Sequence, residues 1–215
     1  MKNIFLEDFI GIWDNALTKE ECDDFIVLFD SLNKMQLTRN RQESEDIPSY
    51  VKDDTAVSFQ GDLIFEGEKW KPCSDIIHMG EDAPLGKKIY DILYSTAKEY
   101  IEKYPTADQS FHYGGYQWKI QKSKAGGGYH VWHKEYSPTT VSRTMTFVFY
   151  LNTIEKGGET QFLYYPHQVE PEEGRLLVFP AGFQHTHRGN IHWDKKGKYI
   201  ITGWLYVQPE LQPRR

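Results

Sequence analysis

The second half of the chain restricts the fold most strongly. After about residue 115, short runs rich in Val, Ile, Thr and aromatic residues are separated by clusters of Gly and Pro, a pattern typical of strands joined by turns. We predict strands at residues 116–122, 129–135, 143–151, 159–164, 174–179, 184–188 and 198–207. Because no helical pattern interrupts these runs, a β-sandwich or jelly roll is favoured over alternating βαβ units.

Two helices are predicted before these strands. Thr18 and Glu21 have the spacing of a capping box, and apolar residues then recur at helical intervals at Cys22, Phe25, Ile26, Phe29 and Leu32. The second helix is expected to start near Pro84 and to end before Pro105, with an apolar face formed by Leu85, Ile89, Ile92, Leu93 and Tyr100. Both helices have one face suited to packing on a sheet.

The expected fold is mainly β with α: a double-stranded β-helix, that is, a cupin-like jelly roll, buttressed by the N-terminal helices. A chain of 215 residues suits a single domain. Residues 1–110 are expected to provide helical support and substrate-side loops, and residues 111–208 the jelly-roll core. Residues 4–17 should lead in as a short strand, and the polar stretch 34–56 should be a loop.

Composition limits the partners and the compartment. The formal net charge of -6 disfavours a nucleic-acid surface, which is usually basic. Cys22 and Cys73 lack metal-binding spacing, so we expect free thiols in a reducing compartment, the cytoplasm. Glu7 and Asp8 interrupt the apolar N-terminus before a signal peptide could form, and no apolar run approaches the roughly 20 residues of a membrane span. We therefore expect a soluble protein without a membrane partner.

A candidate metal site lies in the stretch Gly128–Glu135. His133 and Glu135 are two residues apart and therefore share one face of the predicted strand. An imidazole and a carboxylate supply two of the three ligands of a 2-His-1-carboxylate site. The other histidine is expected from Phe179–Gly189, where His185 and His187 are also two apart, so strand geometry alone leaves both open.

Further ordered motifs extend from about Tyr116 to Tyr206. They are Gly126-Gly127-Gly128-Tyr129, His133-Lys134-Glu135, Phe149-Tyr150-Leu151-Asn152, the run Gly157 to Phe162, the run Gly174 to Pro180, His187-Arg188-Gly189 and Gly197-Lys198-Tyr199-Ile200. In this order the motifs resemble the 2-oxoglutarate and Fe(II)-dependent oxygenase superfamily, and most closely its prolyl 4-hydroxylase-like branch. The tyrosine-leucine-asparagine run followed by Gly-Gly-Glu-Thr is the part most specific to that branch.

The resemblance implies a role for each matching residue. His133, Glu135 and His187 would be the iron ligands, and Lys198 would bind the distal carboxylate of 2-oxoglutarate. His185 would then be a packing histidine or one that supports a metal ligand. The remaining pocket positions implied by the resemblance are Gln121, which stands where the family has a tyrosine that contacts the cosubstrate, together with Thr146, Tyr150 and Thr202.

The chain departs from the family pattern at two points. Glu135 stands where aspartate is usual, and the spacing from His187 to Lys198 is one residue longer than is common. We interpret the first as an equally good oxygen ligand and the second as an added turn residue between positions 193 and 197.

Four residues near the candidate site are not expected to bind the metal. His130 should point away from the metal because its i+2 neighbour is Trp132, and Trp132 and Trp204 are expected in the core. Arg188 is either a cation at the rim of the site or a surface charge. Surface and core readings of this kind follow from residue type alone.

The implied activity is that of an Fe(II)- and 2-oxoglutarate-dependent dioxygenase. It would hydroxylate a substrate C–H bond with O2, release succinate and CO2, and depend on ascorbate. By the same resemblance the substrate is a peptidyl proline, another protein or peptide side chain, or a small molecule. Two alternatives stay open: a non-catalytic jelly-roll protein that binds a metal or small molecule, and an oxygenase acting on nucleic-acid bases, which the acidic charge disfavours.

Overall fold

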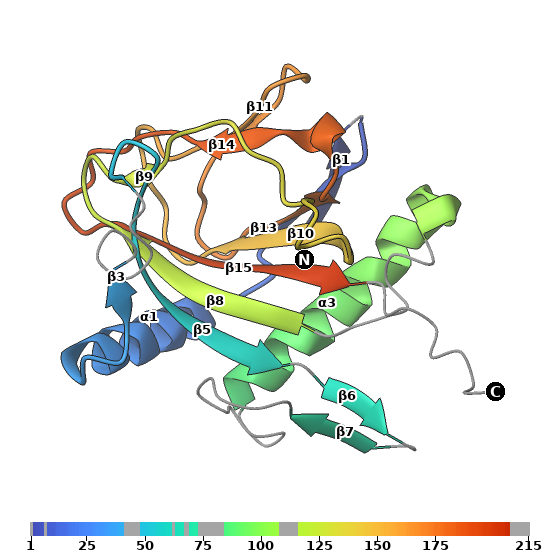
Figure 1. The fold of residues 1–215 in the computed structure, drawn as a ribbon, viewed down its shortest axis with the longest axis horizontal. Helices are drawn as coiled ribbons and strands as arrows, with labels where there is room; N and C mark the ends of the chain where they lie inside the picture. The colour runs from blue at the N-terminus through green and yellow to red at the C-terminus, as the bar shows by residue number, and fades with distance from the viewer. Residues whose placement is uncertain are drawn as a thin grey trace.

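The computed structural model describes residues 2–6, 8–40, 48–61, 63–66, 69–72, 84–107 and 116–206. Its main feature is an antiparallel sheet of eight strands, with two α-helices against one face (Figure 1). The strand order is β1 (Lys2–Leu6), β2 (Ile10–Asp14), β13 (Leu176–Pro180), β10 (Arg143–Tyr150), β15 (Lys198–Tyr206), β8 (Tyr116–Ser123), β5 (Thr55–Gly61) and β3 (Arg39–Asn40). The helices are α1 (Lys19–Lys34) and α3 (Pro84–Lys103).

Shorter strands form a second layer opposite the helices (Figure 1). One small sheet contains β12 (Gln168–Val169), β11 (Thr160–Phe162) and β14 (His187–Gly189), and another pairs β4 (Lys52–Asp53) with β9 (Gly128–Tyr129). A separate hairpin joins β6 (Leu63–Glu66) to β7 (Lys69–Pro72), and two 3-10 turns, η1 (Pro105–Ala107) and η2 (Phe183–His185), complete the described elements. Two facing layers of this kind are the expected jelly-roll architecture.

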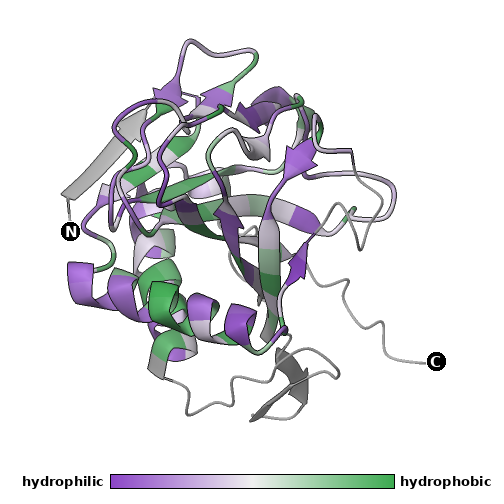
Figure 2. Ribbon diagram, turned by 90° about the vertical axis from the view of Figure 1, so that its left-hand side faces the viewer, coloured by the Kyte–Doolittle hydropathy of each residue, from purple (hydrophilic) through white to green (hydrophobic). Residues whose placement is uncertain are grey.

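Side chains of the large sheet alternate between two interiors. On β10, Phe147 and Phe149 pack with the helices, whereas Val148 and Tyr150 face the smaller sheet. The helices contribute a matching apolar stripe, whose buried members on α1 are Cys22, Phe25, Phe29 and Leu32. Figure 2 shows this striping, with hydrophobic and hydrophilic residues alternating along the helices. The period of two along a strand therefore decides which residues reach the space between the sheets.

Much of the predicted secondary structure is confirmed. The α1 helix begins after Thr18 with both hydrogen bonds of the capping box, and α3 begins at Pro84. The jelly-roll class is confirmed, whereas the lead-in predicted as one short strand at residues 4–17 contains two strands, β1 and β2, paired as a hairpin. No described helix has the length and apolarity needed to cross a membrane.

Three local predictions were wrong. The stretch 34–56 is not only a loop, because β3, β4 and the start of β5 lie in it; residues 41–47 lie outside the described residues. The strand predicted at 129–135 ends at Tyr129, and the one predicted at 184–188 is interrupted by η2. In the last two cases an isolated bridge between His133 and His187 and the η2 turn take the place of long strand ladders.

The backbone conformation at Gly157 and Gly158 is one that only glycine adopts without strain. Both residues have a positive φ, and a Cβ on Gly157 would lie 2.1 Å from the carbonyl oxygen of Ile191. We expect Gly157→Ala to lower the free energy of unfolding by more than about 2 kcal/mol, since the left-handed conformation alone costs an alanine about 1–2 kcal/mol. Denaturant unfolding measures this change.

Gly182→Ala is the matched control for Gly157→Ala. Its φ is -70°, and its added Cβ would meet the flexible end of Gln184. We expect a change within about 0.5 kcal/mol, as for ordinary surface substitutions. Equal losses in the two variants would contradict the steric account of Gly157.

Candidate functional site

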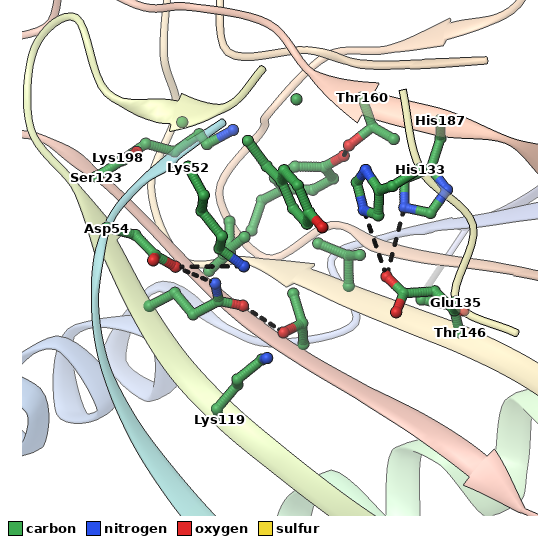
Figure 3. A pocket seen from close by; sticks show the side chains of 18 of the residues that line it. Lys52, Asp54, Lys119, Ser123, His133, Glu135, Thr146, Thr160, His187 and Lys198 are labelled. Carbon is green, nitrogen blue, oxygen red and sulfur yellow. Dashed lines mark hydrogen bonds and ion pairs between the residues drawn. The ribbon is translucent and has the colours of Figure 1, made fainter. Parts of the chain in front are cut away.

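A cavity of about 290 Å³ lies between the large sheet and the smaller strands (Figure 3). Its floor is formed by the inward positions of β8, β10 and β15, and its other walls come from the segments around β4, β9, β11 and β14. The lining residues include His133, Glu135, Arg143, Tyr150, His187 and Lys198. Residues from distant parts of the sequence therefore meet in one space.

Three metal-ligating side chains converge at one end of this cavity. Glu135 Oε1 lies 3.5 Å from His133 Nε2 and 3.7 Å from His187 Nε2, and the ligand atoms all lie within 4.8 Å of one another. His133 and His187 exchange two backbone hydrogen bonds of 2.9 Å, which fixes the spacing of their Cα atoms. The structure thus brings the three sequence-predicted ligands together.

The orientation of both imidazoles suits a cation. Nδ1 of His133 lies 3.0 Å from the carbonyl oxygen of Val131, and Nδ1 of His187 lies 2.9 Å from that of His185. A carbonyl only accepts, so each Nδ1 carries the proton and each Nε2 presents a lone pair to the site. Two imidazole lone pairs and a carboxylate oxygen then face one point, which fits a divalent transition metal.

Neighbouring rings and a cation hold the ligands in place. The Tyr129 ring stacks on His133 with centroids 3.6 Å apart, and Phe179 meets His187 edge to face at 4.7 Å. Arg143 Nη1 lies 3.3 Å from Glu135 Oε2, the carboxylate oxygen turned away from the histidines. The guanidinium is itself stacked on Trp204, 3.5 Å from the ring centroid. One oxygen of the longer glutamate is thereby left for a metal.

Burial and the contacts between Glu135 and the two histidines together shift the pKa values of the cluster. Burial alone would raise the pKa of Glu135, but the two imidazoles outweigh it and hold that pKa well below its ordinary value. Burial lowers the pKa of His133, which favours its neutral, ligating form. An anionic Glu135 carboxylate and a neutral His133 imidazole are the forms in which these two residues bind a metal.

The other two histidines near the motifs lie elsewhere. Nε2 of His185 lies 2.6 Å from the carbonyl oxygen of Asp8, and its ring packs against Tyr165 on the far side of η2. His130 is absent from the described lining of the 290 Å³ cavity and borders a separate cavity with Glu159 and Arg188. His187 rather than His185 therefore faces Glu135, and His130 points away as predicted.

Lys198 marks the opposite end of the cavity from the histidines (Figure 3). Its Nζ donates to the carbonyl of Gly158 at 2.8 Å, and no carboxylate within the described ranges lies at ion-pair distance from it. Burial lowers the pKa of Lys198 to about 8. A buried ammonium in such surroundings is suited to receive an anion from solution.

The other predicted pocket residues also line the cavity. The Gln121 side chain accepts from the Thr202 hydroxyl and donates to Asp54, and the Tyr150 hydroxyl lies 2.7 Å from that of Thr160. Thr146 lines the cavity from β10. The sequence reasoning missed Lys52 and Asp54, an ion pair of 3.6 Å between buried side chains, because a polar segment gave no sign of burial.

Of three expectations about neighbouring residues, one is confirmed and two turn out differently. Trp132 is 37% exposed, so the prediction that it belongs to the core is wrong. Trp204 is buried as predicted, yet its ring also lines the cavity. Arg188 neither borders the main cavity nor stands free on the surface, since it donates two hydrogen bonds to Gln161 and stacks on Trp132.

Comparison with known proteins agrees with this geometry. The model of the 2OG-Fe(II) oxygenase superfamily matches residues 118–206. No curated protein sequence matches the chain. A Pseudomonas putida prolyl-4-hydroxylase has a similar structure with a TM-score of 0.62 and 14% identity, over 93% of this chain and 94% of that chain.

Two further solved structures share the fold. A viral collagen prolyl hydroxylase from Paramecium Bursaria Chlorella virus-1, in complex with 2OG, gives a TM-score of 0.60 at 17% identity over 94% of this chain and 98% of that one. A prolyl hydroxylase from Trichoplax adhaerens, in complex with a peptide fragment of hypoxia inducible factor, gives a TM-score of 0.63 at 17% identity. The match covers 94% of this chain and 84% of that one. At these identities the likeness concerns the fold.

Proposed function

We propose that this chain is a 2-oxoglutarate-dependent dioxygenase, because the model of the 2OG-Fe(II) oxygenase superfamily matches residues 118–206. Its reaction would be the hydroxylation of a C–H bond of a peptidyl substrate, with proline as the first candidate. The observation that carries this proposal is the cavity with the His133, Glu135 and His187 cluster at one end and buried Lys198 at the other. A metal site and a buried cation in one cavity suit a 2-oxo acid that carries a second carboxylate.

In this proposal each cavity residue has a separate task. His133, Glu135 and His187 hold Fe(II), which when bound supplies the coupled reaction in which 2-oxoglutarate, O2 and a C–H group become succinate, CO2 and an alcohol. Lys198 binds the distal carboxylate of 2-oxoglutarate. Three ligands leave coordination positions open for the 2-oxo acid and O2.

A peptidyl substrate is supported by the surroundings of the cluster. Arg143 Nε, Thr146 Oγ1 and Trp204 Nε1 are buried polar atoms that have no hydrogen-bond partner among the described residues, and all three side chains line the cavity. All three atoms can donate, and two of them can only donate, which suits the carbonyl groups of a peptide backbone. Trp132 and Tyr136, which flank the ligands in sequence, are exposed and offer apolar contact area.

The first experiment is anaerobic visible spectroscopy. We expect a charge-transfer band only after both Fe(II) and 2-oxoglutarate are added, and none in the His133→Ala variant. Aerobic incubation with proline-containing peptides should then give succinate together with a peptide heavier by one oxygen atom. A band without peptide modification would move the substrate to another class, and the absence of any band would contradict the cofactor assignment.

We propose a further cofactor and a compartment for this activity. We propose that ascorbate sustains turnover, measured as succinate formed with and without it. A reducing compartment, the cytoplasm, is proposed because Cys22 is a free thiol buried in the core; Cys73 lies outside the described residues.

The affinity for 2-oxoglutarate should fall as the pH rises. Binding needs the Lys198 ammonium, whose pKa of about 8 in the folded protein means that it loses its proton above that pH. Glu159 attracts this charge, and His130 and His192 also face it, but burial lowers the pKa of both histidines, so neither gains charge above pH 8. By linkage we expect up to about a tenfold weaker affinity per pH unit above 8, measured by calorimetry.

Lys198→Arg is the control for this pH dependence. Arginine keeps its charge at any pH that a folded protein tolerates. Its affinity for 2-oxoglutarate should therefore change little between pH 7.5 and about 9.5. A wild-type protein with equally flat affinity would show that Lys198 is not the titrating group.

A further inference from the structure

The cavity is lined by more positive than negative side chains. With histidine counted as neutral, the described lining contains four cations and two carboxylates, namely Lys52, Lys119, Arg143 and Lys198 against Asp54 and Glu135. The chain as a whole has a formal net charge of -6. The positive excess is therefore a local property of the cavity, and a cleft lined by one sign of charge attracts ligands of the opposite sign.

The positive excess remains when the cavity holds the cofactors of the proposed function. The two positive charges of Fe(II) and the two negative charges of 2-oxoglutarate cancel. Two of the cations contact the two carboxylates, since Lys52 Nζ lies 3.6 Å from Asp54 and Arg143 Nη1 lies 3.3 Å from Glu135. Lys198 serves the cosubstrate. Of the four cations, Lys119 is the one to which the proposed function gives no task.

Lys119 lies on the cavity face of β8. It precedes Gln121 by two residues and Ser123 by four, so the three side chains share one face of the strand. Its register partner on β15 is Thr202, which also lines the cavity. Lys119 is partly buried, and Figure 3 shows its ammonium group directed into the cavity.

The Trp204 ring connects Lys119 with the metal end of the cavity. Lys119 Nζ lies 4.7 Å from the ring centroid and Arg143 Cζ lies 3.5 Å from it. Lys119 is paired in register two residues before Trp204 on β15, and Arg143 two residues after it. Arg143 in turn contacts Glu135. One ring and one guanidinium therefore separate a group bound by Lys119 from the metal cluster.

A carboxylate of a peptide suits this position. At neutral pH the anionic groups of an unmodified peptide are the side chains of Asp and Glu and the C-terminal carboxylate. Consecutive Cα atoms are about 3.8 Å apart, so a carboxylate one or two residues from the reacting position comes within reach of Lys119. The attraction is stronger than in water because Trp204 is buried and Lys119 partly so.

We infer that Lys119 is a specificity-determining residue that binds a carboxylate of the substrate, one or two residues from the position that is hydroxylated. This rests on the proposed function, since it names the substrate class of the same cavity, an acidic peptide. The Lys119 ammonium group donates a charged hydrogen bond to that carboxylate.

Peptide binding to the protein loaded with Mn(II) and 2-oxoglutarate, without O2, tests this inference without turnover. The probes are acetylated and amidated peptides with one proline, in which a single position within two residues of the proline carries Glu, Gln or Lys. At one such position we expect the Glu peptide to bind about tenfold more tightly than the Gln peptide, as a hydrogen bond between charged groups does, and the Lys peptide to bind most weakly. A Gln peptide that ends there with a free carboxylate distinguishes a chain terminus from an acidic side chain.

Two variants of Lys119 and one matched control assign the preference. Lys119→Met keeps an unbranched side chain without the charge, and should reduce the preference for Glu over Gln to within about twofold. Lys119→Glu should reverse it, so that the Lys peptide binds best. Lys122→Met should keep the wild-type preference, because Lys122 lies on the opposite face of β8, 4.6 Å from the Tyr199 ring centroid and 3.6 Å from Asp30. Thermal unfolding of each variant identifies any loss of fold.

Failure of the inference and failure of the proposed function look different. If the wild-type protein binds 2-oxoglutarate and peptides but does not prefer Glu, or if Lys119→Met keeps the preference, the inference is wrong and the proposed function stands. An equal loss of preference in Lys122→Met would show a general effect of charge and would also overturn the inference. If no peptide binds, the peptidyl substrate is wrong as well. If 2-oxoglutarate itself does not bind, the proposed function fails.

Discussion

His187→Ala is expected to abolish iron binding and 2-oxoglutarate turnover, whereas His185→Ala keeps both. Of these two histidines, His187 presents Nε2 to Glu135, at 3.7 Å, while Nε2 of His185 contacts the carbonyl oxygen of Asp8. Loss of residues that merely support a metal ligand already costs about 10- to 100-fold in affinity or activity, so loss of a ligand should exceed about 100-fold. His133→Ala and Glu135→Ala should match His187→Ala.

Metal titration followed by the anaerobic charge-transfer band measures this first prediction. His185→Ala removes a buried contact, so it should lower the thermal midpoint without changing iron stoichiometry. Circular dichroism of His187→Ala should remain native-like, because its backbone bridge to His133 does not depend on the imidazole. Iron binding retained in His187→Ala and lost in His185→Ala would contradict the ligand assignment.

Lys198→Ala is expected to weaken 2-oxoglutarate binding by about 100-fold or more while iron still binds. Removing one partner of a buried ion pair costs about 3–5 kcal/mol, and about 1.4 kcal/mol corresponds to a factor of ten. The Lys198 side chain is buried and lies at the other end of the cavity from the metal ligands (Figure 3), so the two functions should separate cleanly.

Lys195→Ala and Lys196→Ala are matched controls for Lys198→Ala. Both lysines are exposed in the same connecting segment, so their removal should leave 2-oxoglutarate affinity within about twofold, the effect expected of a screened surface charge. The dissociation constant of each variant for 2-oxoglutarate, measured by calorimetry, distinguishes the role of Lys198 from that of the two surface lysines. An unchanged affinity in Lys198→Ala would transfer the anion-binding role to another cation.

Strand periodicity explains why much of the site was predictable. Gln121, Tyr150 and Lys198 lie on regular strands of the large sheet, where side chains at alternate positions share a face. The sequence motifs identified these residues. The hydrogen-bonded register of β8, β10 and β15 then brings their side chains to one cavity. Ser123 was also accessible to this reasoning, because it lies two residues after Gln121 on β8.

The remaining parts of the site depend on irregular backbone. His133 and Glu135 share the site although the strand predicted for them ends at Tyr129, because a single backbone bridge to His187 replaces the ladder. Lys52 and Asp54 become buried only when β4 pairs with β9, more than 70 residues away in sequence. Local sequence patterns carry no information on such long-range pairings.

The place of β5 bears on how the chain can be divided. β5 pairs with β8 from Thr55 with Lys122 to Gly61 with Tyr116, although the two strands belong to different halves of the sequence. A fragment beginning at residue 111 would keep all three metal-cluster residues but would expose β8 as a bare edge, open to pairing with another chain. The N-terminal part therefore covers an edge of the sheet that carries the cavity, and we expect a fragment trimmed to the matched residues to associate through the uncovered β8.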